Sequence, residues 1–226
     1  MNLSALFSGH TFAHGVHPAD YKSLTRHLPI RRLPFASTLI VPLSQHAGKP
    51  SIPLVQPGQE VVRGQPIARA DGFMSVPQHA PATGRIKSIQ LMPSARGPKI
   101  PGFILQVYEG STQQELYEYT HDIATMSGDD IIQAVQDAGM VGLGGAAFPT
   151  HVKMTPPAEH HVDVLVANGC ECEPYLTCDH RIMLEQPENL IQGILLVQRA
   201  LGVERAVIGI EDNKMDSVHM LQEHLQ

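Results

Sequence analysis

The sequence contains no tryptophan, and aromatic residues make up only 5% of it. Proteins that bind single-stranded nucleic acid usually stack the bases on aromatic side chains. This scarcity therefore argues against a nucleic-acid partner.

Long apolar runs are missing as well. A helix that crosses a bilayer needs about 20 mostly apolar residues. The longest candidate, from Leu190 to Leu201, is interrupted by Gln192, Gln198 and Arg199. We find no signal peptide either. The sequence predicts a soluble chain that reaches a membrane only through partners or its surface.

Cysteine is scarce, and Cys170, Cys172 and Cys178 lie within nine residues of one another. An odd, clustered set is not typical of a disulfide framework, which favours a reducing compartment. The thiols could form a metal site, but Cys-x-Cys spacing on a strand points successive side chains to opposite faces. We expect free thiols, buried or half-exposed, and no metal.

Charge is divided unevenly along the chain. Residues 1–110 hold 11 Lys or Arg and 4 Asp or Glu, a balance of +7, whereas residues 111–226 hold 5 and 18, a balance of −13. The contrast predicts two units with different surfaces. The basic half could face an acidic partner or anionic lipid, or could simply be a solvated surface.

Residues 1–35 have the composition of an irregular N-terminal arm. The spacing of His10, His14 and His17 would suit zinc ligands on one helical face, but glycine and Pro18 oppose a helix, and no fourth ligand is adjacent. Surface histidines are the simpler interpretation, with a metal site as the alternative.

Residues 36–110 predict a β domain of short strands separated by glycine turns. The expected strands include 38–42, 85–91 and 103–108, the last with alternating Phe103, Leu105 and Val107 on one face. The stretch Pro57–Ala68, followed by His79–Gly84, resembles the barrel-sandwich hybrid fold of lipoyl and biotinyl carrier domains. Carrier function needs a lysine on the hairpin between the two halves, and residues 69–75 contain none. We expect this fold without the carrier chemistry.

Residues 120–226 change to a helical period and predict an α/β domain. Ser127 can cap a helix that ends near Gly139, and Pro187 suits the first turn of another that ends before Gly202. Apolar strands are expected at 162–167 and 205–210, and a last helix from Met215. Two parallel strands make too small a sheet to stand alone, so we expect that this domain continues beyond its C-terminal end here or that a partner completes the sheet.

A glycine-rich loop, from Gly142 through Gly144, Gly145 and Ala146, precedes Lys153. Small residues let backbone N–H groups close around an anion, and the lysine could neutralise a phosphate. The spacing matches neither the P-loop nor the dinucleotide fingerprint. On its own the loop is equally compatible with a plain tight turn.

Acidic and amide side chains follow both predicted strands. Asn168, Glu171 and Glu173 come after the first, and Glu211 and Asp212 after the second. In open α/β sheets, ligands gather at the carboxyl ends of strands. The sequence therefore predicts a site for a polar cofactor along this rim.

These motifs together resemble a known family. The glycine loop with Lys153, and then Asn-x-x-Glu-x-Glu-Pro from Asn168, is similar to the flavin- and NADH-binding core of the complex I 51-kDa-type subunit. A closer resemblance is to the C subunit of the Rnf complex, a bacterial ion-translocating electron-transfer complex. The sequence segments that carry it are 15–18, 171–177 and 210–214. The resemblance covers essentially the whole chain.

The resemblance implies a two-part α+β chain: a barrel-sandwich hybrid, then a flavin/NADH-binding α/β domain. Its implied cofactors are FMN and NADH, and its partners are the other subunits at the cytoplasmic face of the bacterial inner membrane. Two 4Fe-4S clusters would lie in a C-terminal region absent from this sequence. The residues implied to contact FMN or NADH are Gly142, Gly144, Gly145, Ala146, Lys153, Asn168, Glu171, Glu173 and, by a looser match, Glu211 and Asp212.

Two rivals remain beside the NADH-oxidising interpretation. One is a scaffold that has lost the flavin, as in the related sodium-pumping quinone reductase A subunit. The other is a docking module whose basic β domain binds partner subunits. One departure is Cys170, which stands where the complex I pattern has an acidic residue.

Overall fold

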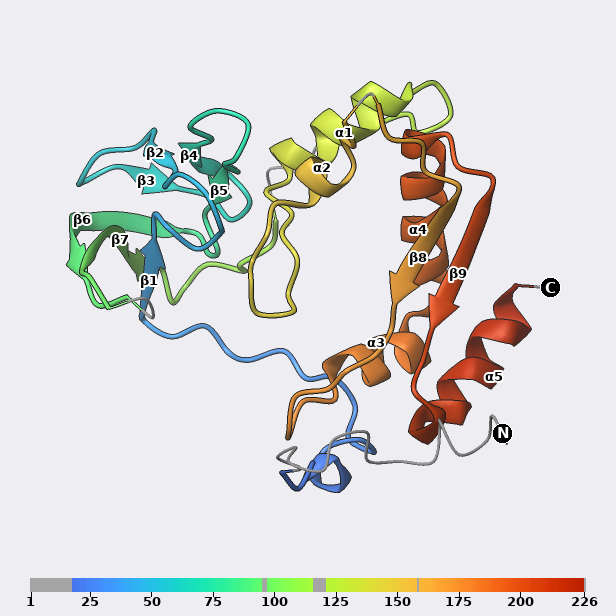
Figure 1. Ribbon diagram of the computed structural model, residues 1–226. Coiled ribbons are helices and arrows are strands. Elements are labelled where there is room, and N and C mark those ends of the chain that lie inside the picture. The colour runs from blue at the N-terminus through green and yellow to red at the C-terminus, as the bar shows by residue number, and fades with distance from the viewer. Residues whose placement is uncertain (1–17, 95–96, 116–120, 158, 226) are drawn as a thin grey trace, which may run out of the picture. The chain divides into compact units, whose positions relative to one another are not determined.

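The computed structural model describes residues 18–94, 97–115, 121–157 and 159–225 (Figure 1). The predictions for His10, His14 and His17 lie outside these residues. The elements in chain order are η2 (Lys22–Leu24), β1 (Thr38–Pro42), β2 (Ile52–Pro53), β3 (Glu60–Val61), β4 (Pro66–Arg69), β5 (Gln78–His79), β6 (Gly84–Met92), β7 (Ile100–Val107), α1 (Gly128–Asp137), α2 (Thr150–Lys153), β8 (Val164–Asn168), α3 (Cys178–Glu185), α4 (Pro187–Leu201), β9 (Arg205–Gly209), η3 (Asp212–Lys214) and α5 (Met215–His224).

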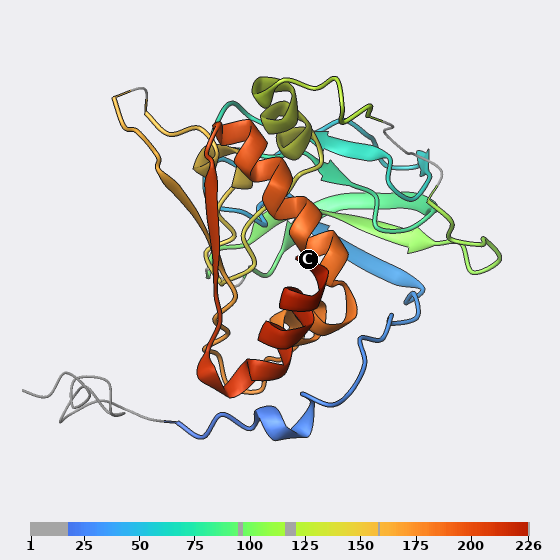
Figure 2. The same ribbon diagram turned by 90° about the vertical axis from the view of Figure 1, so that its right-hand side faces the viewer.

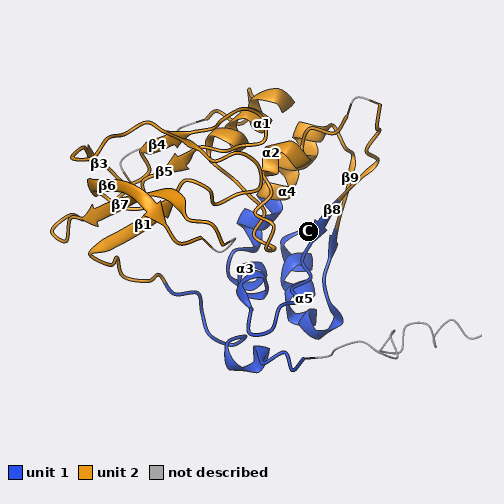
Figure 3. Ribbon diagram, turned by 60° about the vertical axis from the view of Figure 1, so that its left-hand side comes forward, with its two compact units in different colours: residues 1–31, 166–192, 208–226 blue, residues 32–165, 193–207 orange. Residues whose placement is uncertain are grey.

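The chain divides into two compact units (Figure 3). We call the described parts of 1–31, 166–192 and 208–226 the arm unit, and those of 32–165 and 193–207 the barrel unit. This division differs from the sequence-based domains 1–35, 36–110 and 120–226, which stay a prediction. Each unit is described by itself.

The β domain within the barrel unit consists of two antiparallel sheets. One has the strand order β1-β7-β6-β3 and the other the order β2-β4-β5. The predicted strands at Thr38–Pro42, at 85–91 and at 103–108 correspond to β1, β6 and β7. The short strand β2 was not predicted.

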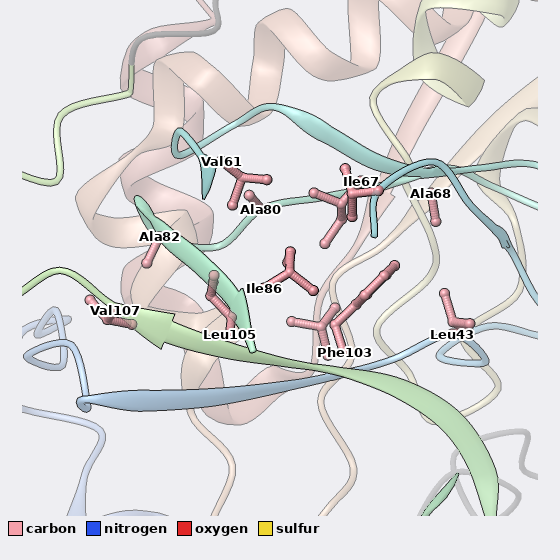
Figure 4. Packing of buried hydrophobic residues seen from close by; sticks show 12 residues of the cluster. Leu43, Val61, Ile67, Ala68, Ala80, Ala82, Ile86, Phe103, Leu105 and Val107 are labelled. Atoms are coloured by element: carbon pink, nitrogen blue, oxygen red, sulfur yellow. The ribbon is translucent and has the colours of Figure 1, made fainter. Parts of the chain in front are cut away.

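An apolar core fills the β domain (Figure 4). On β7 the alternating residues Phe103 and Leu105 are fully buried, and Ile67 of β4 and Ile86 of β6 are fully buried as well. Burying each such side chain stabilises the fold by about 1.5–3 kcal/mol. The predicted inward face of β7 is confirmed.

Glycine is required where β6 begins. A Cβ placed on Gly84 would lie 2.2 Å from the carbonyl oxygen of Gln106 on the neighbouring strand. Such a contact is far inside van der Waals distance, so β6 and β7 can pair this closely only with glycine at the position.

Helix α1 begins and ends where the sequence predicts. The Ser127 hydroxyl accepts a hydrogen bond from the amide of Asp130, whose carboxylate accepts one from the Ser127 amide, which is a capping box. Beyond the helix, Gly139 has φ +71°, a conformation that glycine adopts without strain.

The strands β8 and β9 pair as a two-stranded sheet and point the same way in Figure 1, whereas Figure 2 shows the two strands nearly edge-on. Both strands and α4, which runs from Pro187 to Leu201, were predicted. Two helices were not: the one-turn α2 and the eight-residue α3. Helix α3 packs against α5 within the arm unit.

Candidate functional site

The glycine loop lies in the barrel unit and connects α1 to α2. Its stem is closed by a hydrogen bond from the Gly142 amide to the Phe148 carbonyl, 2.8 Å, and by a bridge between Val141 and Pro149. Between these contacts the loop is exposed, and space is open where Gly144 and Gly145 would carry side chains. The loop therefore presents bare backbone to a ligand.

Lys153, the last residue of α2, reaches the stem of this loop. Its Nζ lies 2.5 Å from where a Cβ on Gly142 would stand, so the ammonium group occupies the space that the missing side chain leaves. Among the described residues, Lys153 has no ion-pair partner. The loop thus combines exposed backbone with one unneutralised cation.

The other predicted site residues lie in the arm unit, around the carboxyl ends of β8 and β9. Asn168 ends β8, and its side-chain oxygen accepts a hydrogen bond from the Cys170 amide at 3.0 Å. The Gly169 amide donates to the Gly209 carbonyl at 2.7 Å. These contacts turn the chain sharply at the end of the sheet.

Glu171 is only 2% exposed, and its carboxylate holds local structure together. Oε1 accepts hydrogen bonds from the Asp179 amide, 2.8 Å, and from the Cys178 thiol, 3.3 Å. It therefore satisfies an amide in the first turn of α3, a position where a negative charge is favourable. The carboxylate of Glu171 therefore has a structural role at the start of α3.

Lys22 supplies the cation nearest to Glu171. Its Nζ lies 3.9 Å from Glu171 Oε2 and donates to the carbonyl oxygens of Glu173, 3.0 Å, and Leu176, 2.7 Å. Lys22 is itself only 8% exposed. Sequence analysis missed this residue, because a lone lysine in an arm has the pattern of a surface charge.

The same segment of the arm holds the 173–177 loop through further contacts. The Tyr175 amide donates to the Asp20 carbonyl at 2.7 Å, and the rings of Tyr21 and Tyr175 stack with centroids 4.8 Å apart. The hydroxyls of Thr25 and Thr177 lie 2.9 Å apart. We call this set of contacts, together with those of Lys22, the arm clasp.

Glu211 links the two strand ends. Its carboxylate accepts hydrogen bonds from the Glu171 amide, 3.1 Å, and from the buried ammonium of Lys214. Burial raises the pKa of the Glu211 carboxyl, but the hydrogen bonds from Lys214 and the Glu171 amide outweigh it, so that this pKa lies below its ordinary value. Glu211 is therefore held ionised.

The three cysteines are free thiols, as predicted, but all are exposed rather than buried or half-exposed. Cys170 and Cys172 follow the end of β8 and are not on a strand, so the argument from alternating strand faces was wrong. Partial burial, the hydrogen bond to Glu171 and the charge of Asp179 raise the pKa of the Cys178 thiol. This thiol is therefore protonated at neutral pH.

The structure brings some predicted site residues together. In the arm unit, Glu171 is hydrogen-bonded to Glu211, while Glu173 and Asp212 are exposed beside them in sequence. In the barrel unit, Lys153 meets Gly142. The convergence of the two groups on one ligand stays a prediction.

Two family models match the chain. The RnfC barrel sandwich hybrid domain matches residues 10–108, and the Nuo51 FMN-binding domain matches residues 135–226. The C subunit of the Na(+)-translocating ferredoxin:NAD(+) oxidoreductase complex from Acetobacterium woodii is 38% identical over 93% of this chain and 48% of its own length. The proton-translocating counterpart from Clostridium ljungdahlii is 37% identical over 94% and 46%.

This chain is a relative of those C subunits. The C subunit of the ion-translocating oxidoreductase complex from Haemophilus influenzae is also 38% identical, over 95% of this chain and 26% of its own length. The chain thus spans about half the length, or less, of the Rnf C subunits that it matches.

The Rnf likeness confirms the predicted fold class, a barrel-sandwich hybrid domain followed by an FMN-binding domain of mixed α and β structure. All ten predicted site residues lie within the FMN-binding match. In the part of the chain that the structure describes, no helix has the length and apolar character that crossing a membrane requires.

Proposed function

We propose that this chain forms the FMN- and NADH-binding part of an Rnf-type C subunit. In this proposal the protein oxidises NADH and passes the electrons through FMN to iron–sulfur centres carried elsewhere in the complex. The match to the FMN-binding domain over residues 135–226 supports the choice of cofactor.

The observation that carries the proposal is the position of the Lys153 ammonium against Gly142, at the stem of a loop with exposed backbone. A phosphate monoester is recognised by backbone N–H groups and one or more cations. The loop offers both, and a side chain on Gly142 would displace the lysine. The residues present therefore fit the phosphate end of FMN.

The arm unit supplies groups for the polar edges of the ligands. Glu173 and Asp212 are exposed carboxylates, and Asn168 is an exposed amide at the end of β8. In this proposal they accept hydrogen bonds from ribose or ring N–H groups. Glu171 and Glu211 do not contact the ligand in this proposal; their hydrogen bonds fix the loop that carries Glu173.

When bound, FMN supplies the exchange between two-electron hydride chemistry and single-electron transfer. The side chains of this chain need only bind, orient and tune, and none is required as a general acid or base. The held charge of Glu211 and the neutral thiol of Cys178 set the local electrostatics at the strand ends.

The wider setting follows from the relatives. The names of the Acetobacterium and Clostridium relatives pair ferredoxin with NAD(+) and sodium or proton translocation. We propose the same class of complex here, with this chain attached peripherally, through its partner subunits, at the cytoplasmic face of the bacterial inner membrane.

The proposal is tested by titrating the full-length protein with FMN and with riboflavin, following quenching of flavin fluorescence. Losing a charge-assisted hydrogen bond costs about 1.5–3 kcal/mol, which weakens binding roughly 10- to 100-fold. Lys153→Ala should weaken FMN binding by this factor and leave riboflavin, which lacks the phosphate, unchanged. Lys87→Ala, at an exposed lysine of β6, is the matched control.

A second measurement addresses NADH. Under anaerobic conditions NADH should bleach the bound flavin, and Glu173→Gln should slow the bleaching while leaving the affinity for FMN within about twofold. If the full-length protein binds no FMN, the flavin-free scaffold takes the place of this proposal. If it binds FMN but NADH never bleaches it, only the NADH part fails.

A further inference from the structure

The arm unit (blue in Figure 3) contains an open groove of about 400 Å³, between residues 25–31 and residues 175–181. Most of the described residues that line this groove are apolar, and none of them is Asp or Glu. None belongs to the set proposed to contact FMN or NADH either. The groove is therefore a feature separate from the cofactor site.

Large apolar side chains gather in and beside this groove. Leu24 and Leu28 are 63% and 50% exposed, and Ile30, Tyr175 and Leu176 are exposed as well. Single exposed apolar residues are ordinary on protein surfaces, but a contiguous group of them marks an interaction surface. This part of the arm unit therefore has the character of a contact face.

The segment that carries three of these side chains is anchored by its backbone. The Ile30 amide donates to the Glu185 carboxylate at 3.1 Å, and the Arg181 guanidinium donates to the Arg26 carbonyl at 3.2 Å. These polar contacts hold the backbone against α3, while the apolar side chains stay exposed. The exposure is therefore a property of the folded arm unit.

Cations lie among the apolar side chains. Arg26 and Arg31 are exposed, and neither has an ion-pair partner among the described residues. Arg181, in contrast, is paired with Glu185 at 2.6 Å. In the sequence, residues 21–59 contain no Asp or Glu. The segment thus combines exposed apolar groups with two guanidinium groups that lack a counter-charge.

We propose that this face, which we call the arm surface, binds the surface of an anionic lipid bilayer. The apolar side chains enter the boundary between headgroups and acyl chains, and the guanidinium groups donate to lipid phosphates. Both kinds of side chain alternate within residues 24–31, so one segment meets both depths of the bilayer. The arm surface consists of Leu24, Arg26, Leu28, Ile30, Arg31, Tyr175 and Leu176.

Charge selects the kind of partner. The chain has a net charge of −6, so an anionic membrane attracts it only where its surface is locally basic. A neutral bilayer would leave both arginines of the arm surface without a counter-charge. A protein partner would have to supply carboxylates and a ridge of matching shape, whereas an anionic bilayer supplies phosphates and acyl chains at every point. Such binding would add a direct lipid contact to the attachment through partner subunits.

Sedimentation of the full-length protein with lipid vesicles tests the role of the cations. Vesicles of mixed phosphatidylcholine and phosphatidylglycerol should bind the protein, and vesicles of phosphatidylcholine alone should not. Each arginine near an anionic surface strengthens binding about fivefold, so Arg26→Gln combined with Arg31→Gln should weaken it about 25-fold. Arg69→Gln combined with Lys87→Gln removes the same charge at exposed positions of the barrel unit and is the matched control.

A second double variant tests the role of the apolar side chains. Leu24→Gln combined with Leu28→Gln keeps the charge and should weaken binding to the mixed vesicles at least tenfold. The melting temperature should be unchanged or higher, because both side chains are exposed. Leu54→Gln combined with Leu91→Gln, at residues of the barrel unit that are exposed to a similar degree, is the matched control.

The proposal is overturned if the mixed vesicles do not bind the protein, if neutral vesicles bind it equally well, or if either arm variant binds as tightly as its control. A clear drop in the melting temperature of the leucine variant would also overturn it, by showing that these side chains stabilise the fold. If the arm variants change the oligomeric state in light scattering and vesicles do not bind, the arm surface contacts a second copy of the chain instead.

Discussion

The β domain of the barrel unit is stabilised by one kind of buried group, and the arm unit is stabilised by another. The first buries a cluster of twelve apolar residues centred on Phe103. Among its described residues, the arm unit buries only Met183, Pro187 and Leu221 as apolar residues, together with Lys22, Glu171, Thr177, His180, Lys214 and Ser217.

This difference predicts which part of the molecule tolerates substitutions and which part fixes a specific geometry. Apolar burial is non-directional, so a core of this kind accepts exchanges that conserve volume. A buried polar group needs its particular partner at a particular distance. The barrel core therefore supports a scaffold, whereas the network around Glu171 fixes the geometry of the loop that carries candidate ligand contacts.

The largest effect is expected where the apolar core is broken. Phe103→Ala should lower the free energy of unfolding by about 3–5 kcal/mol, because it removes a fully buried ring and leaves a cavity. Urea denaturation measures this loss. Phe73→Ala, at a ring that is 53% exposed, is the control and should cost about 1 kcal/mol or less. Equal losses in the two variants would contradict a core centred on Phe103.

A smaller loss is expected where the polar network is broken. Lys214→Met keeps most of the apolar stem but removes the ammonium group that donates to Glu211. Leaving that carboxylate with only the Glu171 amide as a donor should cost about 1–3 kcal/mol in the same urea assay. Lys87→Met, on the exposed face of β6, should change the free energy by no more than about 0.5 kcal/mol. If the free energy of unfolding of the Lys214 variant equals that of this control, the arm unit, like the β domain, is stabilised by apolar packing and not by its polar network.

The smallest expected effect is on the pH dependence of stability, and it arises from two carboxylates of the arm unit, Glu211 and Asp216. Hydrogen bonds from His180 and the Ser217 amide outweigh burial and lower the pKa of the Asp216 carboxyl, as the contacts of Glu211 lower its pKa. A lowered pKa means that the folded chain binds fewer protons than the unfolded chain. The stability is therefore present above the ordinary carboxyl pKa of about 4 and is lost as pH falls through the lower folded values.

The melting temperature, followed from pH 7 to pH 3, should accordingly fall at the acid end. The double variant Glu211→Gln with Asp216→Asn should flatten this fall. Burial and the charge of Glu171 raise the pKa of Asp179, which works weakly in the opposite direction. An unchanged pH profile in the double variant would show that these two carboxylates do not couple to folding.

The same contrast decides what the sequence could predict. Strand β7 and helix α1 were predictable because alternating apolar residues and a Ser127 cap are local signals. Helix α3 was not, because its buried residues are His180 and Met183, which form no apolar stripe. The burial of Lys22 and Lys214 was not predictable either, since each charge is stabilised by partners that only the fold supplies.

For the candidate site, the glycine loop and the acidic rim were recognisable as motifs, but the role of each carboxylate was not. Glu171 and Glu173 are equivalent in sequence, two positions apart, yet one is buried under α3 and the other is exposed. The distinction arises from the start of α3 at Cys178 and from the arm clasp. Neither can be read from the spacing of the acidic residues.

The arm clasp also sets an order for folding. The hydrogen bond from Lys22 to the Glu173 carbonyl joins residues 151 positions apart, whereas β6 and β7 pair through a short connection. Closing so long a loop carries a large entropic cost and is slow, while local pairing is fast. During synthesis the barrel strands can pair long before residue 173 leaves the ribosome. The Lys22 segment must wait for residues 173–177, which are made later, so the arm clasp forms after the barrel strands have paired.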